Sequence, residues 1–201
     1  MVHELISGRE FVLGSASPRR RDLLKIIGIE PLVIIANCEE QFEGDNSDEM
    51  VLANSQEKNI AVREKYKGQG IVLTADTVVK CDDKILGKPA SPDEAAKHLQ
   101  MLSGRMHEVK TGIVIFDNMN NNSQIGVETT RVFFNSLTAK EIDTYIATSE
   151  VFDKAGSYGI QGYASQFVSK IEGCYFNVVG LPIALFYNLI KGVLNDHQSA
   201  E

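Results

Sequence analysis

The chain has 201 residues, of which 43% are apolar, and its formal net charge is −7. This is enough for one sizeable α/β domain, and we expect a single domain over residues 1–201. An acidic chain whose only dense basic run is residues 19–21 is not expected to bind nucleic acid as a polymer, because general nucleic-acid binders are usually basic.

The cysteines and the apolar runs indicate in which cellular compartment the protein is expected. Three widely spaced cysteines predict neither a zinc site nor a disulfide framework. The first ten residues lack the apolar region of a signal peptide, and no apolar run approaches the ~18 residues that span a bilayer. We therefore expect a cytoplasmic protein with no membrane partner.

The first predicted unit covers residues 11–28. Residues 11–13 (Phe-Val-Leu) predict a strand, and the small residues 14–16 allow a tight loop. Ser17 is a favoured helix N-cap and Pro18 suits the first helical position, so a helix is predicted to start here. The unit is thus expected to be a strand, a loop and a helix.

Arg19, Arg20 and Arg21 occupy the first turn of that helix. The helix dipole disfavours each cation there by roughly 0.3–1 kcal/mol, and a bound anion would reverse the sign of this effect. Free backbone N–H groups and guanidiniums together suit a phosphate. The pattern predicts a phosphate site, and the alternative is an exposed turn with solvated arginines.

Two carboxylates follow the next predicted strand. Residues 31–36 (Pro-Leu-Val-Ile-Ile-Ala) are expected to form a buried strand, with a loop over residues 37–42 at its carboxyl end. Ligands bind at such ends in open α/β sheets. Glu39 and Glu40 lie in this loop and are candidates to hold a divalent cation through oxygen ligands. The alternative is an acidic loop that is only hydrated.

A long helix is predicted over residues 48–66, with Ser47 as its cap. On a helical wheel Lys58 falls near the packed face. Two interpretations remain open, because the lysine either covers apolar surface with its stem or reaches into a phosphate site.

The strongest strand prediction is residues 71–80 (Ile-Val-Leu-Thr-Ala-Asp-Thr-Val-Val-Lys). A carboxylate is disfavoured in a strand and costly when buried alone. Asp76 therefore needs a metal, a cation or a hydrogen-bonded water as its partner. Residues 85–89 are expected to return as a hairpin arm, which would bring Lys88 near Asp76 unless it is a surface residue at the strand end.

The remaining chain alternates helices, strands and glycine-rich turns. Residues 153–162 contain three glycines, and Gln161 there either pairs with a base edge or belongs to a surface turn. The other predicted elements are helices over residues 92–102, 139–147 and 181–195, strands over residues 107–116, 124–134 and 175–179, and a turn over residues 171–174.

Several motifs in order resemble those of the Maf family of nucleotide pyrophosphatases, which is related to the inosine-triphosphate pyrophosphatase fold. The motifs are residues 15–20 (Ser-Ala-Ser-Pro-Arg-Arg), 75–79 (Ala-Asp-Thr-Val-Val), 86–89 (Leu-Gly-Lys-Pro), 103–107 (Ser-Gly-Arg-Met-His), 153–162 and 180–182 (Gly-Leu-Pro). Thr148 to Glu150 departs from the family pattern, which has Ser-Gly-Glu there. The resemblance implies an α/β fold with an elongated mixed sheet, flanking helices and two lobes around a central cleft.

The resemblance also implies an activity, which is hydrolysis of a nucleoside triphosphate to the monophosphate and pyrophosphate. By family position, Asp76 would be the general base, and Glu40, Glu39 and Asp76 would be the metal ligands. Ser15 and Ser17 would form the phosphate loop, and Arg20, Lys58 and Lys88 would contact phosphates. Nucleotide choice would depend on Arg19, Thr77 and Gln161. Magnesium or manganese is the expected metal, since the ligands are oxygens.

The nucleotide and the biological role have alternatives. Arg19, Thr77 and Gln161 resemble the subgroup that acts on dTTP and UTP, whereas a sister subgroup acts on 7-methyl-GTP. The family is also named for arrest of septum formation, so a nucleotide-binding regulator is the second hypothesis. The resemblance further implies a homodimer.

Overall fold

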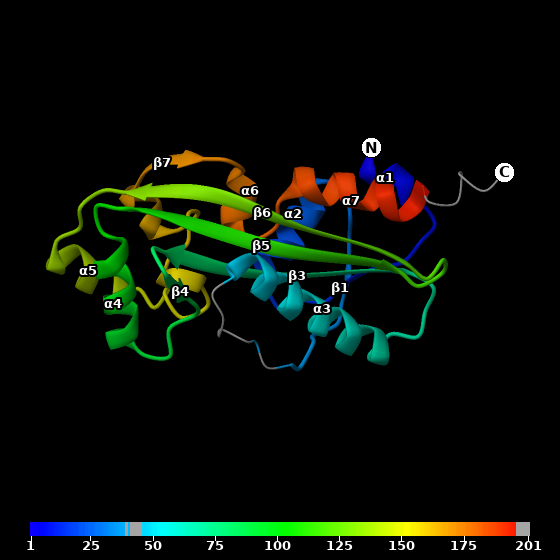
Figure 1. Cartoon of the computed structure of the whole chain (residues 1–201), viewed down its shortest axis with the longest axis horizontal. Coiled ribbons are helices and arrows are strands. Elements are labelled where there is room, and N and C mark those ends of the chain that lie inside the picture. The colour runs from blue at the N-terminus through cyan, green and yellow to red at the C-terminus, as the bar shows by residue number, and fades with distance from the viewer. Residues whose placement is uncertain (39, 41–45, 196–201) are drawn as a thin grey trace.

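A seven-stranded mixed sheet forms the centre of the structure, and helices cover both of its faces (Figure 1). The computed structural model describes residues 1–38, 40 and 46–195. Within these ranges no helix combines the length and the apolar character needed to cross a bilayer. The elements in chain order are α1 (Val2–Leu5), β1 (Phe11–Leu13), α2 (Pro18–Ile26), β2 (Leu32–Val33), α3 (Ser47–Lys65), β3 (Ile71–Cys81), β4 (Lys84–Leu86), α4 (Pro92–Leu102), β5 (Met106–Asp117), β6 (Asn122–Phe134), α5 (Ala139–Ile146), the 3₁₀ helices η1 (Ala155–Ser157) and η2 (Tyr163–Phe167), β7 (Val168–Glu172), α6 (Tyr175–Val179) and α7 (Ile183–Asn195).

The strand order is β2-β1-β3-β5-β6-β7, with β4 also paired to β3. β1 runs parallel to β2 and β3, and every other pairing is antiparallel. The predicted mixed α/β architecture is therefore confirmed. β3 and β5 pair over almost their whole lengths, and in this register Asp76 lies opposite Gly112.

Two hydrophobic clusters divide the molecule into two lobes. The first packs α1, α2 and α7 against β1 and one end of β3 and β5, and its buried members include Leu24, Leu73 and Phe186. The second packs α4 and α5 around the other end of the same long strands. Figure 1 shows α3 on the face of the sheet opposite α7. β3 and β5 thus run through both lobes.

Residues 31–36 differ from their prediction. Only Leu32 and Val33 form a strand, and their exposed fractions are 44% and 38%. β2 is an edge strand of the sheet and pairs on one side with β1 alone. The apolar run therefore marks an exposed sheet edge rather than a buried strand.

The chain after residue 170 also differs from its prediction. Residues 168–172 form the strand β7, although a turn was expected to begin at residue 171. Residues 175–179, predicted as a strand, form the helix α6. The buried amide of Asn177 explains this, because it donates to the Val109 carbonyl at 2.9 Å and to Thr130 Oγ1 at 3.1 Å. These long-range hydrogen bonds override the local β-propensity.

The start of α3 differs by one residue from its prediction. Asn46, not Ser47, is the N-cap, since its side-chain oxygen accepts from the backbone N–H groups of Asp48 and Glu49. Ser47 is instead the first residue of the helix and is buried.

A close backbone contact fixes α3 against the sheet at Gly112. A Cβ atom at this position would lie 2.5 Å from the Val51 carbonyl oxygen. The Ser55 hydroxyl also donates to the Gly112 carbonyl at 2.8 Å. We expect Gly112→Ala to push α3 outward and cost about 1–3 kcal/mol. Thermal unfolding should then show Tm lowered by roughly 2–12 °C.

Gly192 offers a matched control for this substitution. It lies within α7, and a Cβ there would first meet the flexible side chain of Gln124 at 3.3 Å. Gly192→Ala should leave Tm unchanged or raise it, because alanine is the better helix former. Equal Tm values for both variants would contradict the tight α3 contact.

Candidate functional site

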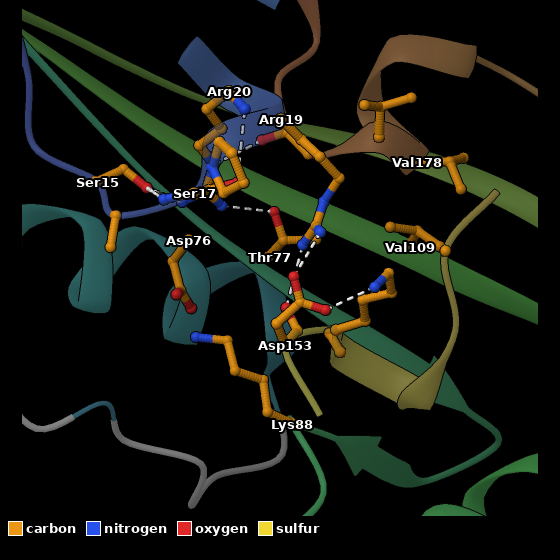
Figure 2. A pocket seen from close by; sticks show the side chains of 18 of the residues that line it. Ser15, Ser17, Arg19, Arg20, Asp76, Thr77, Lys88, Val109, Asp153 and Val178 are labelled. Carbon is orange, nitrogen blue, oxygen red and sulfur yellow. Dashed lines mark hydrogen bonds and ion pairs between the residues drawn. The ribbon is translucent and has the colours of Figure 1, made fainter. Parts of the chain in front are cut away.

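The candidate site lies in a gap along one side of β3. β1 pairs with residues 71–73 of this strand and β4 pairs with residues 79–81, while β5 occupies the other side. Asp76 is in the middle of the segment between the two short pairings. A cavity of about 510 Å³ opens there, and its lining includes every predicted site residue that the structure describes (Figure 2). Glu39 lies outside the described residues.

The loop between β1 and α2 forms one wall of the cavity. Ser17 caps α2, since its hydroxyl accepts from the backbone N–H of Arg20 at 3.5 Å. The backbone N–H of Ser17 in turn donates to Ser15 Oγ at 3.2 Å. The predicted strand, loop and helix are therefore confirmed, and the start of α2 faces the cavity (Figure 2).

The three neighbouring arginines have different environments. Arg20 is 9% exposed, whereas Arg21 is exposed to solvent. Arg19 crosses the cavity mouth and donates to the Asp153 carboxylate at 2.7 Å. The three side chains are of the same type, but they differ in environment because successive residues of a helix point in different directions.

Arg20 binds four oxygens of the protein. Its Nε donates to the Gly180 carbonyl at 2.8 Å, and its two terminal nitrogens donate to Ser15 Oγ, the Ala75 carbonyl and Thr77 Oγ1 at 2.9–3.0 Å. Burial lowers the pKa of Arg20 from its usual value, although arginine stays protonated in proteins. This guanidinium therefore ties the loop between β1 and α2 to both neighbours of Asp76 in the strand.

Asp76 is buried and holds two side chains of α3. One carboxylate oxygen accepts from Lys58 Nζ at 2.5 Å and the other from Asn54 Nδ2 at 3.1 Å. Asn54 and Lys58 are four residues apart, so they lie on the same helix face. The strand carboxylate thus has the cationic partner that its burial requires.

Lys58 also contacts Glu40 at 2.7 Å, so one ammonium lies between two carboxylates. Its side chain is only 12% exposed, which favours the site interpretation over a lysine that merely covers apolar surface. Lys88 Nζ lies 3.9 Å from the same Glu40 oxygen, and Figure 2 shows its side chain extending toward Asp76. The hairpin therefore brings Lys88 to the cavity.

The glycine-rich loop over residues 153–162 forms the opposite wall. Two buried hydrogen bonds anchor it, one between His98 Nδ1 and Ser157 Oγ and one between His107 Nε2 and Tyr158 Oη, both 2.8 Å long. Gln161 lies at the end of this loop and lines the cavity.

The Thr77 hydroxyl, which the resemblance assigned to nucleotide choice, is engaged within the protein. It accepts from Arg20, and it lies 2.9 Å from the Thr111 hydroxyl on β5. Its contribution to the cavity wall is therefore fixed by these two neighbours.

The burial of His107, which anchors the glycine-rich loop through Tyr158, makes the free energy of unfolding depend on pH. Burial lowers the pKa of His107 to about 4. An unfolded histidine titrates near 6.5, so below that pH the unfolded chain binds a proton that the folded protein does not. Folding stability should therefore fall as the pH drops from 6.5 to about 4, by roughly 3 kcal/mol in full.

His107→Gln tests this dependence. The difference in Tm between pH 7 and pH 4.5 should be smaller in the variant than in the native protein. Burial lowers the pKa of His98 too, but that residue is present in both proteins and its effect cancels. Parallel Tm profiles would rule out His107 as the source.

Two residues that matter in this geometry escaped the sequence analysis. Asn54 could have been found, because it stands one helical turn before Lys58 on the face predicted to pack. Asp153 is the first residue of the motif over residues 153–162, but nothing in the local sequence links it to Arg19, 134 residues away. Among the described residues, moreover, no group of three or more His, Cys, Asp or Glu side chains could hold a metal ion.

The chain is similar to several curated relatives named dTTP/UTP pyrophosphatase. The one from Syntrophomonas wolfei is 46% identical over 179 residues, which is 89% of this chain and 94% of the relative. Those from Carboxydothermus hydrogenoformans and Bacillus cereus are 46% and 44% identical, covering 89% and 91% of this chain and 96% and 95% of the relatives. A solved structure of a HAM1 protein from Coxiella burnetii has a TM-score of 0.44 at 15% identity, over 76% of this chain and 88% of that one.

The chain also matches a family model, which describes a whole family rather than a single relative. The model described as Maf-like protein matches residues 10–193, which include the loop between β1 and α2, the strand of Asp76 and the glycine-rich loop. With this match and relatives of about 45% identity, the chain belongs to the Maf family.

Proposed function

We propose that the protein is a nucleoside triphosphate pyrophosphatase that converts dTTP or UTP to the monophosphate and pyrophosphate. The observation that carries this proposal is the position of Asp76, a buried carboxylate among the cations of one cavity. The names of the relatives support the reaction and the nucleotides. A pure binding site for an anion does not require a buried carboxylate at its centre.

In this proposal Asp76 is the general base for water attack on the α-phosphate. A carboxylate within reach of a water can take its proton, and that proton stays on the Asp76 oxygen during the attack. Lys58, Lys88 and the N–H groups at the start of α2 balance the charge of the phosphates and of the departing pyrophosphate. The strands, helices and loops around the gap in β3 pairing hold these charged groups and N–H groups in place before the substrate binds.

The described residues fit a divalent metal completed by the substrate. Glu40 and Asp76 direct one oxygen each at a single cation, the Lys58 ammonium, at 2.7 and 2.5 Å. Magnesium is often bound by one or two carboxylates together with substrate phosphates, so two carboxylates suffice. We propose that Glu40 and Asp76 hold magnesium or manganese, with Glu39 as a further candidate. The metal, when bound, would neutralise triphosphate charge.

Nucleotide choice is proposed to depend on Arg19, Thr77 and Gln161. Gln161 is exposed at the cavity wall, and its amide can both donate to and accept from the edge of a pyrimidine. Arg19 lies at the cavity mouth, and Thr77 is held between Arg20 and Thr111.

Pyrophosphate release from a panel of nucleotides tests the proposal. The panel contains dTTP, UTP, CTP, GTP and 7-methyl-GTP, each with magnesium or manganese, and the products are separated so that pyrophosphate is distinguished from orthophosphate. Fast release from dTTP and UTP is the expected result.

Other outcomes separate the parts of the proposal. Release from 7-methyl-GTP or another purine nucleotide alone would retain the reaction and overturn the nucleotide assignment. Tight binding of dTTP or UTP without turnover would overturn the enzymatic proposal and favour a nucleotide-binding regulator.

A further inference from the structure

Asp153 joins the two lobes across the mouth of the cavity. Its carboxylate accepts from Arg19 Nη1 at 2.7 Å, and its backbone carbonyl accepts from Arg19 Nη2 at 3.1 Å. Arg19 belongs to α2 in the first lobe, whereas Asp153 follows α5 of the second. Figure 2 shows the two side chains meeting. The Arg19 side chain is 25% exposed, so its guanidinium is held at the cavity rather than in free solution.

The carboxylate is itself fixed from the other side. Lys154 Nζ donates to the second oxygen of Asp153 at 2.6 Å and to the Glu150 carbonyl at 2.6 Å. Partial burial raises the pKa of Asp153, but the hydrogen bonds from Lys154 and Arg19 outweigh this and hold the pKa below its usual value. Asp153 is therefore an ionised and oriented partner for Arg19.

Arg19 keeps more donors for a ligand than Arg20. A guanidinium has five N–H groups, and two of those of Arg19 point at Asp153. Arg20 directs four of its five at the protein. Within the part of the chain that the structure describes, Arg19 is thus the arginine of the cavity with more donors left for a substrate.

We infer that Asp153 is a positioning residue, which holds the Arg19 guanidinium over the cavity so that its remaining N–H groups meet the bound nucleotide. The inference rests on the proposed function, in which Arg19 contacts the substrate. Asp153 acts through Arg19 and does not touch the nucleotide. A long, flexible side chain loses less entropy on binding a ligand when its direction is already fixed.

A double-mutant cycle tests this role. Asp153→Asn is expected to raise KM for dTTP or UTP about tenfold with little change in kcat, because the charge-assisted hydrogen bond to Arg19 is lost. Arg19→Gln should have an effect at least as large. If Asp153 acts through Arg19, the double variant will match Arg19→Gln within about twofold.

A matched control and a binding measurement complete the kinetic test. Asp143→Asn removes an exposed carboxylate of α5 in the same lobe and should leave KM unchanged. Dissociation constants for α,β-imido-dUTP should follow the same pattern as KM. Additive effects in the cycle, or tighter binding by Asp153→Asn, would overturn the inference, since Asp153 would then contact the substrate itself or compete with it for Arg19.

A substrate-free readout separates this inference from the proposed function. In ¹⁵N-arginine NMR spectra, Arg19→Gln identifies the Arg19 Nε–H signal. Asp153→Asn should shift and broaden that signal, and Asp143→Asn should not. A shifted signal in a protein that neither binds nor hydrolyses nucleotides would overturn the proposed function while the pairing stands. If the protein hydrolyses dTTP but Asp153→Asn leaves the Arg19 signal unchanged, the inference about Asp153 is overturned and the proposed function stands.

Discussion

Asp76→Asn is expected to lower kcat for dTTP or UTP by about 10²–10⁴-fold, the usual contribution of a general base. The amide has nearly the same shape as the carboxylate but cannot take a proton from water. Asn54 and Lys58 remain on α3 to face the new side chain, and Glu40 remains paired with Lys58. Binding of a non-hydrolysable triphosphate should therefore persist. Single-turnover rates together with dissociation constants would measure both effects.

Asp83→Asn is the control for this prediction. Asp83 is an exposed carboxylate in the turn between β3 and β4. The kcat of the Asp83→Asn variant should therefore equal that of the native protein. A kcat within tenfold of native in Asp76→Asn would remove Asp76 as the base. A loss of binding as large as the loss of rate would instead mean that Asp76 acts by placing Lys58 or by holding the metal.

Arg20→Met should be the most destabilising substitution in the basic run. The guanidinium serves four acceptors from three parts of the chain, and methionine provides no donor for them. Leaving buried acceptors unpaired costs about 1–3 kcal/mol each, and we expect a total loss of about 3–5 kcal/mol. For a chain of this length that corresponds to a Tm lowered by roughly 6–20 °C, measurable by calorimetry.

The neighbouring arginines provide matched controls. Arg21 is exposed, so Arg21→Met should change stability by no more than about 0.5 kcal/mol. Arg19→Met loses one partly exposed ion pair and should also have a small effect on stability. A fully stable Arg20→Met variant with weakened nucleotide binding would show that Arg20 acts mainly as a phosphate contact, as the resemblance implied.

The order of the elements around the site could be predicted because local signals agreed there. Ser17 and Pro18 mark the start of α2, and the apolar run of residues 71–80 marks β3. The burial of Arg20 was also accessible, since it stands three and four residues before Leu23 and Leu24 on one helix face. Within a run of three arginines, this spacing rather than residue type distinguishes Arg20 from its neighbours.

Other features depend on contacts that no local pattern contains. The α6 helix forms where residue types favour a strand, because Asn177 binds Val109 and Thr130. The pairing of Arg19 with Asp153 joins opposite lobes. The exposed position of β2 follows from its place at the end of the strand order, which a run of apolar residues does not encode.

The two long strands that cross both lobes also limit how the enzyme can move. β3 and β5 are hydrogen-bonded to each other from one lobe to the other, with Asp76 near the middle of the shared ladder. A bend between the lobes would have to distort this ladder next to Asp76, the proposed general base. We therefore expect nucleotides to enter and leave by movement of the loops and side chains around the cavity, while the paired strands keep the proposed base in place.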